Sequence, residues 1–255
     1  MLDALINSAG VYVLVLFRIA GMMIFAPLLG STRIPRRVRG LVALVLAAAI
    51  APSVSLPAHM PQTPWDLALG IGGEIVFGLA MGFILSMIFV ATQWAGEIIG
   101  QQMGLNLGET FDPQFGSHAS VIGDVYYFLT LLIFLAIDGD RATLRGVHDS
   151  FGPLPLLSVG INRSILAMIV NLFGATTVLA MQLAAPMLVT MLVVDLVLGF
   201  IGKTMPQLNI MTAGIAAKSL IGTMVIILSL SLTSNVIRDA LFGAMKNMYA
   251  SYTTR

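Results

Sequence analysis

The sequence predicts an all-α membrane protein built from helical hairpins of long apolar helices. Of its 255 residues, 58% are hydrophobic and only 10% are charged, whereas a soluble domain carries about 25% charged residues. Apolar runs that approach the ~20 residues needed to cross a bilayer recur along the whole chain. We therefore expect a single integral membrane domain over residues 1–255, covered by lipid or by a large assembly.

Composition also excludes several classes of function. The net charge is +1 and the basic residues form one short cluster without aromatic neighbours, so we expect no nucleic-acid partner. The chain has no cysteine, which excludes disulfides and thiol chemistry. The chain starts with Met1, Leu2 and Asp3 before the apolar stretch begins. This start lacks the positive region of a cleavable signal, so we expect the first helix to be retained.

Proline, charge and polarity divide the chain into apolar segments. A loop with Arg33, Arg36, Arg37 and Arg39 follows the first segment and holds four of the thirteen basic residues, which is typical of a cytoplasmic loop. Four prolines from Pro52 to Pro64 predict an extended connection after the second segment. Pro186 and Asp195 are expected to divide the fifth segment, which is too long for one ordinary span. The expected segments are Ala9–Gly30, Leu41–Ala51, one from Leu67, Ala119–Ile137, Ile165–Ile201 and Ile210–Leu232.

Two further features concern the membrane. Trp65 and Trp94 are 29 residues apart, about 43 Å along a helix, which would suit aromatic belts at both interfaces. Six alternating crossings from a cytoplasmic 33–39 loop would place the basic carboxyl tail outside and the acids Glu97, Glu109 and Asp112 inside. Because this conflicts with the positive-inside rule, we expect a re-entrant hairpin, or helices that pack inside an assembly and do not all cross lipid.

Glycine recurs every fourth residue in GEIIGQQMGLNLG and at the same spacing upstream. This spacing places the glycines on one side of a helix, where another backbone can approach closely. Ordinary close packing is one interpretation, and a helix that lines a constricted, mobile passage is the other. The glycines are Gly78, Gly82, Gly96, Gly100, Gly104 and Gly108.

The stretch LNLGETFDPQFGSH, residues 105–118, interrupts the apolar pattern with acids, a proline and two phenylalanines. A surface turn is the simplest interpretation. At membrane depth, however, a loop is tolerated only inside protein or beside a water-filled cavity. Phe111 and Phe115 would then be placed to close a pore by apolar contact and dewetting.

Six charged residues lie within or beside the apolar segments, where an unpaired charge costs at least ~2.5 kcal/mol at a helix centre. They are Arg18, Glu74, Glu97, Asp195, Lys203 and Lys218. We expect structural ion pairs in preference to a proton relay or a substrate site. In particular, Asp195 is expected to pair with Lys218 or Lys203 across a helical hairpin.

Catalytic patterns are weak throughout. His59, His118 and His148 stand apart, without HExxH spacing, and neither GxSxG nor a Walker A loop occurs. We therefore expect no enzyme, no metal site and no cofactor.

Several blocks together resemble the FliR family of flagellar export-gate proteins, whose injectisome counterpart is the SctT family. The blocks are Arg18 with GMMIFAPLLG, IPRRVRG, IGGEIVFGLAMGF with Glu74, and GEIIGQQMGLNLGETFDP. The most specific one is DLVLGFIGKTMPQLNIMTAGIAAK, with Pro206, Gln207, Asn209 and Gly214 between Asp195 and Lys218. The resemblance covers nearly the whole chain and favours the flagellar system over the injectisome.

The resemblance implies a structural subunit of a pseudo-helical gate for type III protein export, in the bacterial inner membrane at the flagellar basal body. FliP-like and FliQ-like subunits would be its partners, FlhA-like and FlhB-like subunits its neighbours, and unfolded flagellar proteins its passing substrates. The loop after the glycine-rich helix would help to plug the channel. The residues that it assigns to the plug are Asn106, Glu109, Thr110, Phe111, Asp112, Pro113 and Phe115.

A different class of function is also compatible with the residues. In a small-molecule or ion transporter, Glu74, Glu97 and Asp195 would form coupling sites near the membrane midplane beside broken helices. Uptake of a defined solute by the isolated protein would distinguish this alternative.

Overall fold

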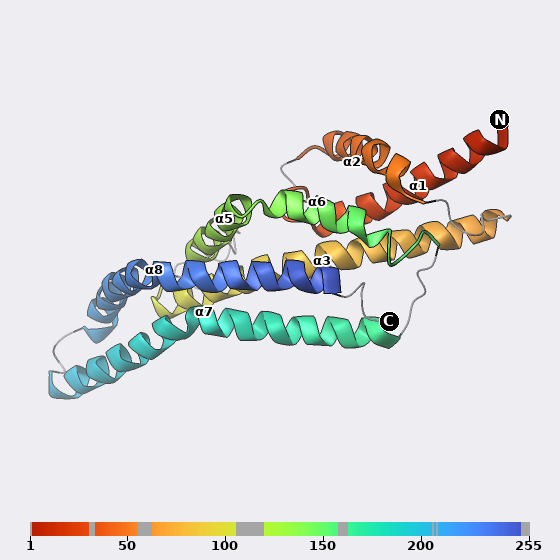
Figure 1. Ribbon diagram of the computed structural model, residues 1–255. Coiled ribbons are helices and arrows are strands. Elements are labelled where there is room, and N and C mark those ends of the chain that lie inside the picture. The colour runs from red at the N-terminus through yellow and green to blue at the C-terminus, as the bar shows by residue number, and fades with distance from the viewer. Residues whose placement is uncertain are drawn as a thin grey trace. The chain divides into compact units, whose positions relative to one another are not determined.

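The described part of the chain is helical and contains no strand. The computed structural model describes residues 2–30, 34–55, 63–105, 120–157, 163–205, 207 and 209–250. The helices are labelled as in Figure 1. In chain order they are α1 (Leu2–Phe25), α2 (Arg36–Ile50), the short 3₁₀ helix η1 (Ala51–Ser53), α3 (Pro64–Gln102), α5 (Val121–Ala136), α6 (Gly139–Ser150), α7 (Arg163–Thr204) and α8 (Ile210–Ala250).

This architecture confirms the all-α membrane class. Within the described residues, three helices are long and apolar enough to cross a bilayer: α3, and the parts Val170–Thr204 of α7 and Thr212–Lys246 of α8. A fourth crossing results if α5 and α6 together count as one broken span. The described helices therefore offer three or four long spans. This is fewer than the six alternating crossings that conflict with the positive-inside rule.

Three boundaries differ from the sequence prediction. The expected 33–39 loop is wrong from Arg36 onward, because α2 begins there and includes Arg36, Arg37 and Arg39. The expected division of the fifth segment is also wrong, because α7 continues through Pro186 and Asp195 for 42 residues. Finally, the expected segment Ile210–Leu232 is too short, because α8 continues to Ala250 and has 41 residues.

The chain groups into two compact units, each made of separate segments. The first contains residues 1–87, 134–172 and 241–255, and the second contains residues 88–133 and 173–240. The core of the first unit is formed mainly by α1, with Leu14, Val15 and Met22 fully buried. The prediction of a single domain over 1–255 stays a prediction.

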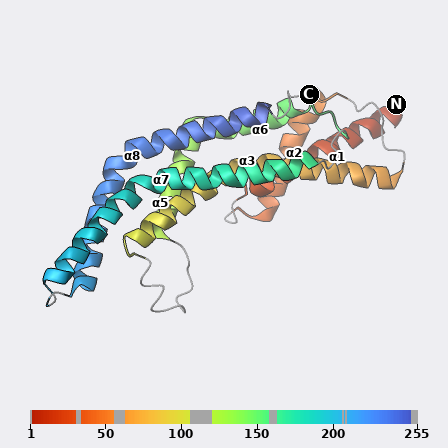
Figure 2. The same ribbon diagram turned by 90° about the horizontal axis from the view of Figure 1, so that it is seen from below.

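The second unit contains a helical hairpin. The carboxyl-terminal part of α7 and the amino-terminal part of α8 lie side by side in both views (Figure 1 and Figure 2). An ion pair between Asp195 and Lys218 joins the two helices. A hairpin of long apolar helices is thus present, as the sequence predicts.

Candidate functional site

The glycines of α3 meet different helices along its length. A Cβ added to Gly78 would collide with backbone atoms of Arg18 and Met22 on α1, and one on Gly82 would collide with Met22 again. Gly21 of α1 completes this crossing, because its Cβ would lie 2.5 Å from the carbonyl oxygen of Ile75. At these positions the absent side chains let the backbones of α1 and α3 touch.

Further along α3, Gly96 faces α5. A Cβ on Gly96 would lie 2.6 Å from Cα of Gly123 and 2.7 Å from the carbonyl oxygen of Ile122. Gly100 is also buried. The glycines of α3 therefore serve at least two crossings, with α1 in the first unit and with α5 in the second. Gly21 and Gly123 lie outside the four-residue repeat, and this is why the repeat did not reveal them.

Gly104 has another role from the one expected. It follows the end of α3 with φ 75°, a conformation that costs little only for glycine. The amide of Gly104 donates to the carbonyl of Gln101 at 3.0 Å, and that of Leu105 to Gly100 at 3.1 Å. These two bonds form a Schellman motif, which ends a helix. The expectation that Gly104 packs a helix side is therefore wrong; it fixes the point where the chain leaves α3.

The predicted plug residues 106–116 and Gly108 lie outside the described residues, but the described structure includes the base of this loop. Met103 is 1% exposed. Its side chain lies against Gly222 of α8, where a Cβ would come 2.5 Å from Cγ of Met103. The end of α3 is therefore held against α8, immediately before the loop departs. Gly222 was not predicted, because no local pattern marks it.

Arg18 and Glu74 form a buried ion pair between α1 and α3. Both side chains are 0% exposed, and Nε of Arg18 lies 2.5 Å from Oε2 of Glu74. Arg18 also donates to Oγ of Ser150 at 3.0 Å and to the carbonyl oxygen of Leu154 at 3.3 Å. The other carboxylate oxygen of Glu74 accepts the amide of Leu157 at 3.0 Å.

Aromatic rings complete the surroundings of Arg18. Its guanidinium carbon lies 4.2 Å from the ring centroid of Phe151 and 4.8 Å from that of Phe77, which favours a buried cation. Two charges removed from water are tolerable only with such partners. The pair therefore connects α1, α3, the end of α6 and the turn that follows α6, residues 151–157.

The second charged pair belongs to the α7–α8 hairpin. Nζ of Lys218 lies 2.5 Å from Oδ1 of Asp195, with the two side chains 23% and 47% exposed. Of the two partners expected for Asp195, Lys218 is the one that forms the ion pair. Lys203 is exposed in the last turn of α7. The side chain of Glu97 is half-buried on α3 and makes no hydrogen bond or ion pair with any described residue.

The MPQLN block builds the start of α8. The side-chain oxygen of Asn209 accepts the amide of Thr212 at 3.3 Å, which is an N-cap that satisfies a free backbone donor. Gly214 is buried, and a Cβ there would lie 3.3 Å from Leu198 of α7. Gln207 is exposed, and Pro206 lies outside the described residues. One hairpin thus uses all three residues: Asn209 caps the start of α8, Gly214 allows the close approach of α7, and Lys218 forms the ion pair.

Nothing in this geometry resembles a metal centre. No group of three or more His, Cys, Asp or Glu that could hold a metal ion occurs among the residues whose positions are described. His148 interacts with Oγ of Ser53 and with its neighbour Asp149, both at 3.0 Å, while His59 and His118 lie outside the described ranges. The arrangement is one of helix contacts and ion pairs.

Comparison with known proteins identifies the family. The model of the bacterial export proteins, family 1, matches residues 9–244. The flagellar biosynthetic protein FliR of Bacillus subtilis is 28% identical over 98% of both chains, and that of Escherichia coli is 31% identical over 78% of this chain and 76% of its own. The surface presentation of antigens protein SpaR of Shigella flexneri is 28% identical over 83% of this chain and 82% of its own. The chain therefore belongs to the family of bacterial export proteins that includes FliR.

Proposed function

We propose that this chain is a structural, channel-forming subunit of a flagellar type III protein export gate in the inner membrane, and that it helps to form and plug the pore through which unfolded substrates pass. Membership in a family of bacterial export proteins supports a role in protein export. The partners that we propose are FliP-like and FliQ-like subunits, with FlhA-like and FlhB-like subunits beside them.

The observation that carries this proposal is the uncovered apolar surface of α7 and α8. Among the described residues, only 17% of an 18-residue apolar stretch of each helix is buried, against 56% for α3. Exposed apolar side chains on α7 continue from Phe173 to Ile201, about 42 Å at 1.5 Å per residue. Because the hydrocarbon core of a bilayer is about 30 Å thick, a straight crossing would leave part of this surface for sister subunits.

The two paired acids fit a structural role better than ion coupling. Glu74 is fully buried, and its two oxygens are bonded to Arg18 and to the amide of Leu157. Asp195 is held by Lys218. A coupling site needs an acid that a passing ion or proton can reach, and Glu74 offers no free oxygen.

The base of the loop supports the proposed plug. A Schellman motif at Gly104 and the contact between Met103 and Gly222 fix where residues 106–116 begin. In the proposed gate, this segment closes the passage by apolar contact through Phe111, and exported chain displaces it. No covalent bond is made or broken.

Two measurements test the proposal. The tagged full chain should co-purify with the FliP-like and FliQ-like subunits of its cell, and recovery of the chain without them would contradict the gate. Deletion of Glu109 to Gln114 should let ions or small solutes leak across the membrane while the subunits still assemble. The matched control is Phe115→Tyr, which keeps an aromatic ring, and cells with this variant should not leak. Unchanged permeability after the deletion would contradict the plug.

A further inference from the structure

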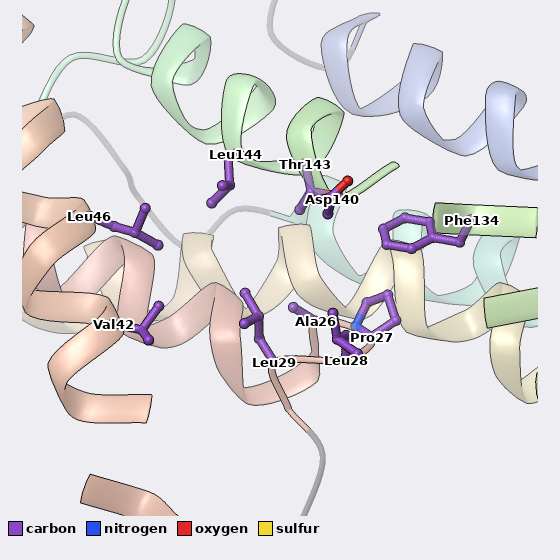
Figure 3. Close-up of a pocket in the computed structure, with 10 residues that line it drawn as sticks. All are labelled: Ala26, Pro27, Leu28, Leu29, Val42, Leu46, Phe134, Asp140, Thr143 and Leu144. Atoms are coloured by element: carbon purple, nitrogen blue, oxygen red, sulfur yellow. The ribbon is translucent and has the colours of Figure 1, made fainter. Parts of the chain in front are cut away.

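Helix α2 has two apolar sides, and the described residues cover only one of them. Ala43 and Ala47 are buried in the core beside α1. Val42 and Leu46 line a pocket of about 180 Å³ together with the turn that follows α1, residues 26–29, and with α6 (Figure 3). This side of the helix is therefore part of the first unit.

The opposite side of α2 carries large apolar side chains that no described part of the chain covers. Val38, Leu41 and Val45 are 46%, 61% and 66% exposed. Their spacing of three and four residues places them on one face. With 15 residues, α2 is about 22 Å long, too short to cross ~30 Å of hydrocarbon. A helix of this length, with one side packed on protein and an apolar face left exposed, suits the membrane interface, where such a face lies just below the headgroups.

Three arginines stand at the amino-terminal end of α2. Arg36, Arg37 and Arg39 lie in the first turn of α2, which contains no acidic residue. No ion pair links any of them to the described residues, and Nε of Arg39 is buried without a hydrogen-bond partner among them. Asp140 of α6 lines the same pocket as Val42 and Leu46, but it lies next to Thr143 and away from those two residues (Figure 3). One end of α2 thus carries positive charge without an acidic partner among the described residues, next to an exposed apolar face.

We propose that α2 is an interfacial anchor that binds anionic phospholipid, with acyl chains against Val38, Leu41 and Val45 and lipid phosphates on the three arginines. Guanidinium groups bind phosphate oxygens in bidentate geometry. Lipid, in contrast to a free anion, satisfies the charges and the apolar face together. The anchor does not depend on the proposed function, because it concerns only how α2 meets the membrane.

The first experiment measures lipid preference. The full chain, in the assembly recovered from cells, is placed in bilayers of phosphatidylcholine and phosphatidylglycerol that contain a spin-labelled form of one or the other. We expect protein to immobilise the labelled phosphatidylglycerol several-fold more than the labelled phosphatidylcholine, since one arginine near the surface contributes roughly five-fold. Arg36→Gln, Arg37→Gln and Arg39→Gln together should bring the ratio close to one. The corresponding three lysine substitutions should keep the preference, because they keep the charge.

The matched control removes the same charge elsewhere in the first unit. Arg141→Gln, Arg145→Gln and Lys246→Gln change exposed cations of α6 and α8, and the lipid ratio should stay as in the unchanged chain. An equal loss in this control, or no preference in the unchanged chain, would overturn the anchor. If added inorganic phosphate abolishes the preference for phosphatidylglycerol, the arginines bind a free anion. This result would overturn the proposed anchor as well.

The second experiment asks what covers the apolar face. Because the chain has no cysteine, Leu41→Cys and Val45→Cys can each carry a single nitroxide label. In the assembled protein in lipid, oxygen should collide with both labels more often than a water-soluble nickel chelate does. A label at Arg145→Cys, on the exposed side of α6, serves as the aqueous control. If neither oxygen nor nickel reaches positions 41 and 45, a sister subunit covers α2 and the proposal fails.

Discussion

Arg18 stabilises the first unit because each of its polar contacts is satisfied away from water. It lies fully buried among Glu74, Ser150 and the carbonyl of Leu154, between two aromatic rings. The contribution of such a pair to the free energy of unfolding depends on every partner being present. Removing one partner leaves the other charge buried and unpaired. The sequence separation of 56 residues between Arg18 and Glu74 also makes this contact specific to the folded chain.

Glu74→Gln should lower the free energy of unfolding by about 3 to 5 kcal/mol, because the guanidinium of Arg18 loses its counter-charge in a dry site. Denaturant titration of the purified chain in detergent, followed by circular dichroism, measures the change. Ser150→Ala is the control, since it removes one hydrogen bond to Arg18 and one to the carbonyl of Val147 and leaves the ion pair intact. Arg18→Met combined with Glu74→Leu should recover part of the loss. A double variant less stable than Glu74→Gln would contradict this account of the pair.

The exposed pair Asp195 and Lys218 should contribute far less than the buried one. Since the two side chains are 47% and 23% exposed, we expect a coupling energy of roughly 0.5 to 1 kcal/mol. A double-mutant cycle with Asp195→Asn and Lys218→Gln, measured by the same titration, isolates this coupling. Lys203→Gln in place of Lys218→Gln is the control and should show no coupling. Additive effects of Asp195→Asn and Lys218→Gln would disprove the ion pair in solution.

At the scale of elements, the glycines of α3 decide how closely its neighbours approach. Gly78 and Gly82 meet the backbone of α1, whereas Gly72 on the same helix has nothing within 4 Å of an added Cβ. One helix thus offers a matched pair of positions, one filled by a neighbouring backbone and one open.

Gly78→Ala should destabilise the chain by about 1 to 3 kcal/mol, because its methyl group must push α1 away. Gly72→Ala should be neutral or stabilising by up to about 1 kcal/mol, since alanine favours a helix where space is available. Thermal unfolding of the two variants, followed by circular dichroism, makes the comparison directly. Equal effects at the two positions would show that helix propensity, and not close packing, governs these glycines.

Periodicity and composition predicted the helices well and their limits less well. Polarity suggested a loop through Arg39, yet α2 begins at Arg36, because arginines can lie in the interface while the rest of a helix packs. Pro186 suggested a break, yet α7 continues. Proline removes one backbone hydrogen bond at ~3 kcal/mol, whereas ending a helix in an apolar environment would leave several backbone groups unpaired. Burial of Leu183, Ala184 and Met187 also holds this part of α7 in place.

The ion pairs show where prediction from sequence ends. Asp195 and Lys218 flank one turn, so a hairpin suffices to bring them together. Arg18 and Glu74 meet only through the crossing of α1 and α3, and Ser150 and Leu157 reach them from α6 and the following turn. A single sequence marks such charges as needing partners, but it does not state which. The contact between Met103 and Gly222 was hidden for the same reason.

At the scale of the whole molecule, the chain leaves more apolar surface on α7 and α8 than it covers. Leu192, Val193 and Leu196 on α7 are each more than half exposed, in the half of the helix that forms the hairpin with α8. Helices in a membrane gain little from the hydrophobic effect, so subunits there associate through shape and close packing. Substitutions on this surface should therefore weaken assembly and leave the fold of the chain intact.

Leu192→Gln combined with Leu196→Gln should reduce the FliP-like and FliQ-like subunits recovered with the tagged chain by at least about ten-fold, which corresponds to about 1.4 kcal/mol of lost association. The amount of the chain itself in the membrane should stay within about two-fold, because neither side chain is buried in its own core. Leu192→Ile with Leu196→Ile keeps the apolar surface and should keep the partners. If the glutamine variant retains its partners, lipid alone covers this part of α7. Loss of the chain together with its partners would instead show that α7 and α8 depend on the assembly to fold.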